Sequence, residues 1–298
     1  MHKPLSDISF GHNLLRTKVL YVSDLDGTLL DPHSHITARS AELLNTAISR
    51  GALFTIATAR TPGTVVDIMR DVKMQLPAVV MTGAALFDLN SLSYSRICRI
   101  DADTVKRMIP IYRRHGVSTF IYLISPNQKL DCYHIGELNQ YEKTFIAERC
   151  HNPFKTFHVP ANGESVLPDS FDNTILLFSV QPWENAHALW QEIKDNPEIP
   201  CYPLCYHDAF GPEWGELEMF GPQTSKAAAV EAIASDAGVG RIVAFGDNVN
   251  DIPLFELADE GFAVQDAIDR LKDIATGVIG SNADDAVAEF ILKESSMK

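Results

Sequence analysis

The sequence is short of three features that would each indicate a class of protein: long apolar runs, paired cysteines and an excess of basic residues. No apolar segment approaches the roughly 20 residues needed to span a bilayer, so we expect no membrane partner. Lys and Arg total 25 against 39 Asp and Glu, which gives a formal charge of -14. Because such a chain repels phosphate backbones at long range, we expect no nucleic-acid partner.

The cysteines are few and poorly spaced for a structural role. There are five, an odd number with no CxxC pair, and reduced thiols of this kind are typical of the cytoplasm. Cys201, Cys205 and His207 lie close in sequence, but the proline and aromatics around them favour a packed strand over a metal site. Residues 1–17 lack the apolar core of a signal peptide, and we interpret them as a flexible lead-in to a cytoplasmic protein.

The length and the apolar pattern predict two domains. The chain has 298 residues, of which 46% are hydrophobic, enough for substantial cores. Short apolar strands alternate with helical patterns at both ends of the chain, which is typical of an α/β fold with a parallel sheet. Between them the pattern changes to crowded aromatics, prolines and polar residues, which indicates an inserted second domain. We predict a first core segment at 1–97, an inserted domain at 98–214 and a second core segment at 215–298.

Acidic residues follow the first predicted strand directly. Asp24 and Asp26 come after an apolar run at 19–23, and Gly27 allows a sharp turn there. In open α/β sheets ligands bind beyond the carboxyl ends of the strands. The same edge should receive four further side chains from strand ends and helix starts: Thr58, Lys226, Asp247 and Asp251.

This set of residue types predicts phosphate chemistry with a metal ion. Several carboxylates in one pocket repel each other unless a cation holds them, and hard oxygen ligands select Mg²⁺. Asp24 is placed to act as a nucleophile, and Asp26 to protonate the leaving alkoxide and then deprotonate water. Lys226 and Thr58 offer a charge and a hydroxyl to phosphate oxygens, while Asp247 and Asp251 complete the metal site.

Read together, the motifs resemble the haloacid dehalogenase superfamily, and within it the Cof-like sugar-phosphate phosphatases of subfamily IIB. The segments that carry the resemblance are DLDGTLL at 24–30, TAR at 58–60, TGAALFD at 82–88, SK at 225–226 and GDNVND at 246–251. The resemblance implies a Rossmann-like core with an inserted α+β cap of type C2. It also implies an aspartyl-phosphate mechanism with Mg²⁺ held by Asp24, Asp26 and Asp247, and with Asp251 and Asn250 supporting metal and phosphate.

Further residues are candidates for contacting the substrate, a small phosphorylated metabolite for which a sugar phosphate is the first expectation. On the core these are Arg60, Thr82, Gly83 and Asn250, although Arg60 could instead form a structural ion pair. On the cap, the leaving group could be read by one or two residues from this set: Tyr133, His134, His207 and Trp214.

Two other functions fit the same scaffold. A phosphotransferase of the phosphomannomutase type would pass the phosphoryl group to another sugar hydroxyl instead of to water. A non-catalytic binding protein would keep the fold alone, but the presence of Asp24, Asp26, Lys226 and Asp247 argues against it. The sequence does not indicate an oligomeric state.

Overall fold

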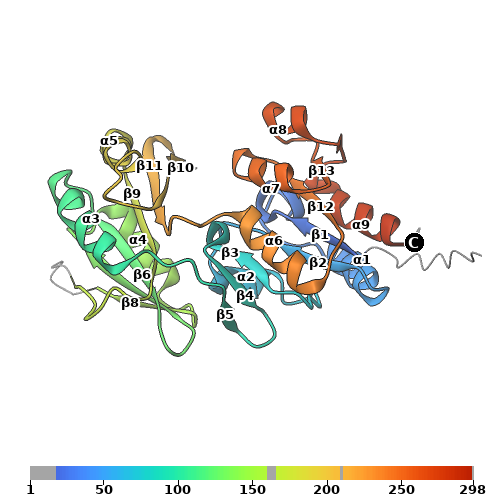
Figure 1. Ribbon diagram of the computed structural model, residues 1–298, viewed down its shortest axis with the longest axis horizontal. Helices are drawn as coiled ribbons and strands as arrows, with labels where there is room; N and C mark the ends of the chain where they lie inside the picture. Colours follow the sequence, from blue (N-terminus) through green and yellow to red (C-terminus); the bar gives the residue numbers. More distant parts are fainter. Residues whose placement is uncertain (1–17, 160–165, 209–210, 297–298) are drawn as a thin grey trace, which may run out of the picture.

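The computed structural model describes residues 18–159, 166–208 and 211–296, so the expected lead-in at 1–17 lies outside the described residues. The chain forms two lobes (Figure 1). The larger lobe holds both ends of the described chain, and the smaller lobe is formed by its middle, residues 102–220. Within the described part of the chain, no helix is long and apolar enough to cross a membrane.

The larger lobe is built on a parallel sheet, as the alternating pattern predicts. In the described chain it has five strands, and β1, the most buried of them, lies between β12 and β2. From one edge to the other, the strands are β14 (Gly277–Val278), β13 (Glu260–Ala263), β12 (Arg241–Gly246), β1 (Val19–Ser23) and β2 (Leu53–Ile56). The helices of this lobe are α1 (Ala38–Ser49), α2 (Pro62–Ile68), α6 (Lys226–Ala237), α7 (Ile252–Leu257), α8 (Asp269–Ile274) and α9 (Ala286–Ser296).

A further apolar segment, at 77–81, has a mixed role. It forms β3 (Ala78–Val80), which meets the parallel sheet through a single bridge between Ala57 and Val79. Its regular pairing is antiparallel, with β4 (Ala85–Asp88), and β4 pairs in turn with β5 (Ser93–Ser95).

Local capping chemistry explains where the helices begin. The Thr37 side chain accepts a hydrogen bond from the Ser40 N–H and starts α1. Ser225 starts α6 in the same way, and Gly238 ends that helix in the left-handed conformation. Pro62 occupies the first turn of α2, although the Thr61 side chain makes no capping bond there.

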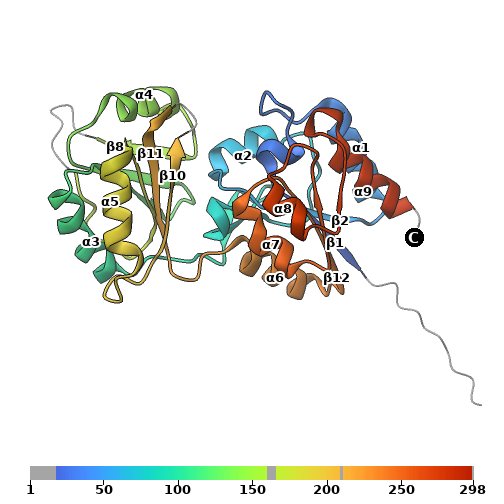
Figure 2. The same cartoon turned by 90° about the horizontal axis from the view of Figure 1, so that it is seen from above.

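The smaller lobe is an α+β unit with a largely antiparallel sheet. Helices α3 and α5 cover the face of this sheet away from the larger lobe, and the opposite face looks toward that lobe (Figure 2). The strands, from one edge of the described sheet to the other, are β10 (Tyr202–Asp208), β11 (Gly211–Phe220), β9 (Thr174–Pro182), β6 (Thr119–Ile124), β7 (Leu130–Ile135) and β8 (Lys155–His158). The helices are α3 (Ala102–Arg114), α4 (Gln140–Arg149) and α5 (Trp183–Lys194).

Two short connections join the lobes and lie against each other. A Cβ atom on Gly221 would lie 2.5 Å from the Arg99 carbonyl oxygen, so the return connection passes closely over the outgoing one. The expected boundary between residues 214 and 215 falls inside β11, which continues to Phe220. The strand continues because Leu217 and Met219 still pack into the core of the smaller lobe.

Candidate active site

Asp24 lies at the carboxyl end of β1, in the centre of the parallel sheet. Its N–H donates to the Phe245 carbonyl of β12 at 3.0 Å, and the chain then enters a single wide turn, η1 (Leu25–Leu29). Gly27 in this turn has φ +74°, and a Cβ there would lie 2.6 Å from Asp247 Oδ2. Glycine therefore allows both the turn and the close approach of the Asp247 carboxylate.

Lys226 connects two of the expected acids. Its Nζ donates to Asp24 Oδ1 at 2.6 Å and to Asp251 Oδ1 at 2.7 Å. The lysine is the first residue of α6, directly after the capping Ser225, and it is 2% exposed. Asp24 and Asp251 are 227 positions apart in the sequence. The fold at this edge of the sheet brings them together on either side of the Lys226 ammonium group.

The charges of this cluster do not balance. Burial alone would lower the pKa of Lys226, but Asp24 and Asp251 outweigh it and raise the pKa, so the ammonium stays protonated. Burial raises the pKa of Asp24, Lys226 opposes that rise, and the charges of Asp251 and Asp247 add to it. Burial and the Asp251 charge raise the pKa of Asp247 to about 6. Three carboxylates against one ammonium leave room for a further cation.

Asp251 is fully engaged by protein donors. Besides the Lys226 contact, its Oδ2 accepts from the backbone N–H of Asp247 at 3.1 Å and of Asn248 at 3.2 Å. Asp247 is less engaged: its Oδ1 accepts from Thr28 Oγ1 at 3.0 Å. Asp247 therefore has more free oxygen capacity for a metal ion, whereas Asp251 holds Lys226 and the start of the turn in place.

The residues present fit a divalent cation. One oxygen from each of Asp24, Asp247 and Asp251 can be chosen so that all three lie within 4.8 Å of one another. Hard oxygen donors with excess negative charge suit Mg²⁺, which takes one or two carboxylates and keeps several waters. Among the described residues, this is the group of acids, histidines and cysteines close enough to hold a metal ion.

The Asp26 side chain turns away from that group toward Arg60. The guanidinium donates twice, from Nε to Oδ2 at 2.7 Å and from Nη2 to Oδ1 at 2.6 Å. The Asp26 hydrogen bond is the largest of the effects that raise the pKa of Arg60. Of the two interpretations left open for Arg60, the structure therefore contains the ion pair. Asp26 and Arg60 both line a large cavity that lies between the two lobes.

Thr58, Thr82 and Gly83 bring a second strand end to the same place. Thr58 accepts at Oγ1 from the Arg60 N–H at 3.1 Å, and its carbonyl accepts from the Thr82 N–H at 3.0 Å. Thr82 has φ +58°, an uncommon conformation for threonine, and lines the cavity. A Cβ on Gly83 would collide with the Ser225 carbonyl, so this turn packs directly against the start of α6.

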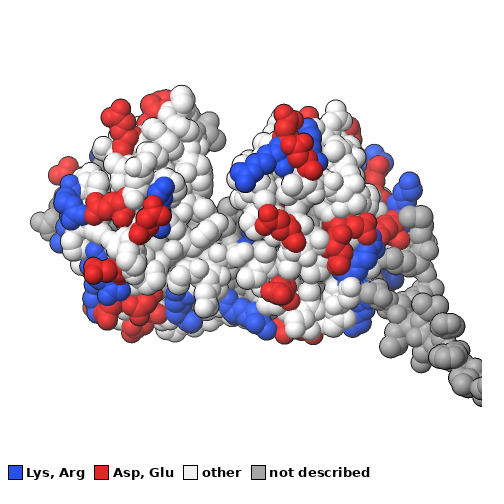
Figure 3. Space-filling model, turned by 45° about the horizontal axis from the view of Figure 1, so that its top comes forward, with Lys and Arg blue, Asp and Glu red and all other residues white. Residues whose placement is uncertain are grey.

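A cavity of about 1040 Å³ lies between the lobes, beside these residues. The hollow separates the two lobes in the space-filling view (Figure 3). Asn250, which is exposed, lies at its rim together with Asn248 and Val249. The smaller lobe contributes a largely aromatic wall: Tyr122, Phe145, Phe178, Tyr202, Tyr206 and His207, with Arg149, Lys155, Leu176, Leu204, Cys205, Glu216 and Glu218.

The sequence offered four candidates for this wall, of which one or two were expected to line it. Of the four suggested residues, His207 lines the cavity, but Tyr133 stacks on His158 with ring centres 4.4 Å apart, and His134 is 1% exposed. Trp214 packs on Tyr141 instead. Strand alternation in β11, where Glu216 and Glu218 alternate with inward Leu217 and Met219, was a usable signal for the wall.

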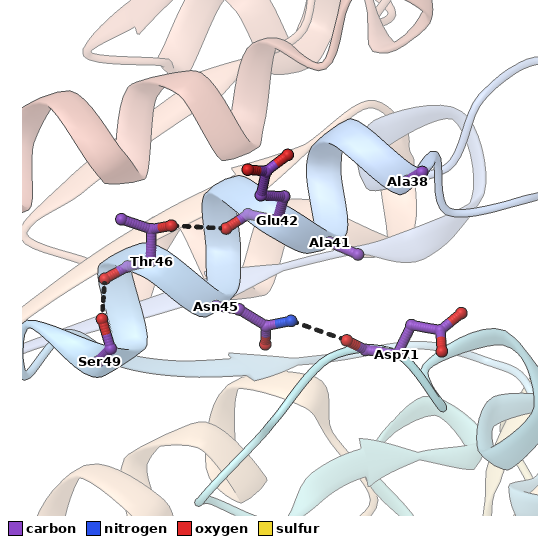
Figure 4. Close-up of a pocket in the computed structure, with 7 residues that line it drawn as sticks. All are labelled: Ala38, Ala41, Glu42, Asn45, Thr46, Ser49 and Asp71. Atoms are coloured by element: carbon purple, nitrogen blue, oxygen red, sulfur yellow. Dashed lines mark hydrogen bonds between the residues drawn. The ribbon is translucent and has the colours of Figure 1, made fainter.

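A second hollow and the cysteines show no features of a competing site in the part of the chain that the structure describes. A hollow of about 470 Å³ lies along α1 and is lined by neutral or acidic residues (Figure 4). Within it, Asn45 Nδ2 donates to the Asp71 carbonyl and Thr46 Oγ1 donates to the Glu42 carbonyl, both at 2.8 Å. All five cysteines are free. His207 stacks on Trp183 with ring centres 3.7 Å apart, as expected for a packed strand.

A model of the haloacid dehalogenase-like hydrolase family matches residues 21–291. The chain therefore belongs to this family, and within it the chain is a phosphoric monoester hydrolase. It is 27% identical over 307 residues to 5-amino-6-(5-phospho-D-ribitylamino)uracil phosphatase YwtE of Bacillus subtilis (strain 168), a match that covers 90% of this chain and 95% of that protein.

One further relative and one solved structure are similar to this chain. The chain is 26% identical over 291 residues to pyridoxal phosphate phosphatase YbhA of Escherichia coli (strain K12), covering 93% of this chain and 98% of that one. Its fold is similar to that of a haloacid dehalogenase-like hydrolase from Bacteroides thetaiotaomicron, with TM-score 0.74, 19% identity and coverage of 93% and 100% of the two chains. The Rossmann-like core expected from the motifs is thus confirmed.

Proposed function

We propose that this protein is an Mg²⁺-dependent phosphatase that hydrolyses a small phosphorylated metabolite through an aspartyl-phosphate on Asp24. The observation that carries the proposal is the contact of Lys226 with Asp24 and Asp251 at 2.6 and 2.7 Å, beside a third carboxylate and next to a large cavity. Burying several charged side chains together costs free energy of folding. A bound phosphate ester and its cation would interact with each of these charges.

In the first half of the reaction, Asp24 Oδ attacks phosphorus and the bond from phosphorus to the ester oxygen breaks. The leaving oxygen takes a proton from Asp26, whose side chain lines the cavity. Arg60 positions that carboxyl group through its two hydrogen bonds. In the second half, Asp26 removes a proton from water, the water oxygen attacks phosphorus, and Asp24 is released with inorganic phosphate.

Other groups hold the phosphate during both halves. Lys226 supplies a fixed positive charge at the Asp24 oxygen, and Thr58, at the end of the neighbouring strand, would supply a hydroxyl. Mg²⁺ would be held by Asp24, the Asp26 carbonyl and Asp247, and would neutralise charge on the phosphate oxygens. Asp251 holds Lys226 and the Asp247 backbone in position by accepting hydrogen bonds from both. Thr82 and Asn250 line the mouth on the core side, and Gly83 packs their side of the site against the start of α6.

We further propose that the smaller lobe is a cap that selects the substrate. Its sheet forms one wall of the cavity, and the two connections that would act as hinges touch at Arg99 and Gly221. A cap over the site excludes bulk water and leaves space for a small molecule but not for a folded phosphoprotein. Two relatives are named for small phosphorylated substrates, a ribitylamino-uracil phosphate and pyridoxal phosphate, and molecules of this size fit such a space.

The test is phosphate release from a panel of sugar phosphates, nucleotides, pyridoxal phosphate and an aryl phosphate, with and without Mg²⁺. We expect metal-dependent release that Asp24→Asn lowers by at least about 10⁴-fold while the thermal unfolding curve keeps its cooperative form. Unchanged turnover in Asp24→Asn would refute the nucleophile assignment. Transfer of phosphate to an added sugar, without release, would instead support the phosphotransferase alternative.

A further inference from the structure

A buried lysine, Lys155, lies in the wall that the smaller lobe contributes to the cavity. It is the first residue of β8, pairs in register with Leu130 of β7 and is 9% exposed. Its Nζ lies 5.3 Å from the centre of the Tyr122 ring and 5.6 Å from that of Phe145. Both distances are within cation–π range, so aromatic faces surround this ammonium group.

Lys155 has no acidic partner in the part of the chain that the structure describes. Burial lowers its pKa to about 8, and the ionisable neighbours are Cys132 and Arg149. Cys132 is a neutral thiol because burial raises its pKa to about 12, and Arg149 carries the same charge as the lysine. At pH 7 Lys155 is therefore mostly protonated, buried and without a counter-ion, which is a costly arrangement.

A second unusual polar group, Glu218, lies in the same wall. It is 6% exposed, and Tyr206 Oη donates to its Oε2 at 2.9 Å. Burial raises the pKa of Glu218 to about 8, and the charge of Glu216 adds to the increase. At neutral pH it is mostly a carboxylic acid, which can donate one hydrogen bond and accept others.

Phe178 lies between these two groups. It pairs across the strands with Glu218, and its ring centre lies 6.4 Å from Tyr122 and 5.4 Å from Phe145, the rings that flank Lys155. The residue is only partly buried and lines the cavity. The wall thus presents an aromatic platform with a cation toward one side and a protonated acid toward the other.

We propose that this wall recognises the leaving group of the substrate as a flat heteroaromatic ring. The ring stacks on Phe178, an acidic ring oxygen supplies the counter-ion for Lys155, and Glu218 hydrogen-bonds a polar group on the opposite edge. The substrate class is then a phosphate monoester whose alcohol carries such a ring, rather than a plain sugar phosphate. This inference rests on the phosphatase reaction proposed above.

The chemistry of the wall separates these two substrate classes. A sugar ring offers neutral hydroxyls, which leave the Lys155 charge without a counter-ion and place polar groups against aromatic faces. An ionised ring oxygen satisfies the charge in a site of low polarity, where a charge-assisted hydrogen bond is strong. Stacking adds the burial of a large apolar surface.

The experiment compares pyridoxine 5′-phosphate, a pyridine ring with an acidic hydroxyl and no aldehyde that would react with lysines, with D-glucose 6-phosphate. Phosphate release gives kcat/KM for both, and calorimetric titration of the Asp24→Asn protein gives Kd for both. We expect a ring preference of at least tenfold that Lys155→Met lowers by at least tenfold. Glu218→Gln tests the opposite side of the wall, and Lys143→Met, on the exposed face of α4, is the matched control.

Each outcome bears on the inference. A preference for the sugar phosphate, or equal losses for both substrates in Lys155→Met and in Glu218→Gln, would overturn it. Loss of ring preference in either variant, with none in Lys143→Met, would support it. If the wild-type protein releases no phosphate but the Asp24→Asn protein still binds the ring compound through Lys155, the phosphatase proposal fails while the recognition inference holds.

Discussion

The two lobes each bury a lysine beside the same cavity, and the chain treats the two ammonium groups in opposite ways. Lys226 in the larger lobe contacts two carboxylates, which raise its pKa. Lys155 in the smaller lobe is surrounded by aromatic rings, and burial lowers its pKa to about 8. Burial is similar in the two places, so the difference lies in whether the chain supplies the counter-ion.

This difference separates chemistry from selection. A group that needs the same charge for every substrate is fixed by partners within the protein, so Lys226 is ready before any ligand arrives. A group that distinguishes substrates gains from having no partner of its own, since only the right ligand then satisfies it. The larger lobe therefore carries the reaction in our proposal, and the smaller lobe carries the specificity.

The largest expected effect comes from removing the paired lysine. Lys226→Met leaves Asp24 and Asp251 buried without their cation, so we expect a loss of about 3–5 kcal/mol in the free energy of unfolding. We also expect kcat/KM to fall at least about 10³-fold. Urea unfolding and phosphate release measure the two effects. A loss of stability below about 1 kcal/mol would show that the two carboxylates do not depend on Lys226.

The same substitution in the smaller lobe should act in the opposite direction. With a pKa near 8 in the folded state and about 10.4 in the unfolded state, protonated Lys155 costs about 3 kcal/mol below pH 8. Lys155→Met removes that cost, so we expect a gain of about 1–3 kcal/mol at pH 7, an example of stability given up for function.

The pH dependence provides the check on this prediction. The unfolded state binds the additional proton between pH 8 and about 10.4, so the stability of the wild-type protein rises with pH across this window. The advantage of Lys155→Met should therefore shrink over the same window. Urea unfolding at pH 7 and pH 10 measures it, with Lys143→Met as the exposed control. A destabilised Lys155→Met protein at pH 7 would show that the lysine serves packing instead.

The contrast between the two lysines also shows how far sequence reasoning reaches. Lys226 was predictable because it stands at the expected start of a helix, where the alternating pattern returns. The structure shows that Ser225 caps that helix. Lys155 was not predictable, because its face of the sheet depends on the register of β8 against β7, which pairs Lys155 with Leu130 across an intervening helix. No local motif encodes that register.

The same reasoning applies to the rest of the fold. The parallel strands of the larger lobe followed from short apolar runs, whereas the end of the inserted segment was placed six residues too early, inside β11. The strand is hard to recognise in the sequence because it contains the polar residues Glu216 and Glu218. They are tolerated since one face of the strand lines a cavity and not a core. The Asp26–Arg60 contact could be foreseen only as one of two possibilities, since both partners are in loops that converge after folding.

Metal binding should stabilise the larger lobe by an intermediate amount. At 100 times its Kd, Mg²⁺ would add about 2.7 kcal/mol to the free energy of unfolding, which corresponds to an increase of several degrees in Tm. Thermal unfolding with and without Mg²⁺ measures this without any turnover. Asp247→Asn removes a carboxylate that has more free oxygen capacity than Asp251 and should abolish the shift, whereas Lys155→Met should retain it. An equal shift in Asp247→Asn would place the metal elsewhere.

We expect the smallest effect on stability from a change at Arg60. This cation has one carboxylate partner, whereas Lys226 has two and Lys155 has none among the described residues. Its side chain is 24% exposed and its partner Asp26 is 49% exposed, so water competes for both charges. We expect Arg60→Gln to change the free energy of unfolding by less than about 1 kcal/mol. Its effect on kcat should be larger, about tenfold, because the two hydrogen bonds orient the carboxyl group that transfers protons. Urea unfolding and the pH profile of kcat separate the two roles. A stability loss above about 2 kcal/mol with an unaltered pH profile would make Arg60 a structural residue, and not one that positions Asp26.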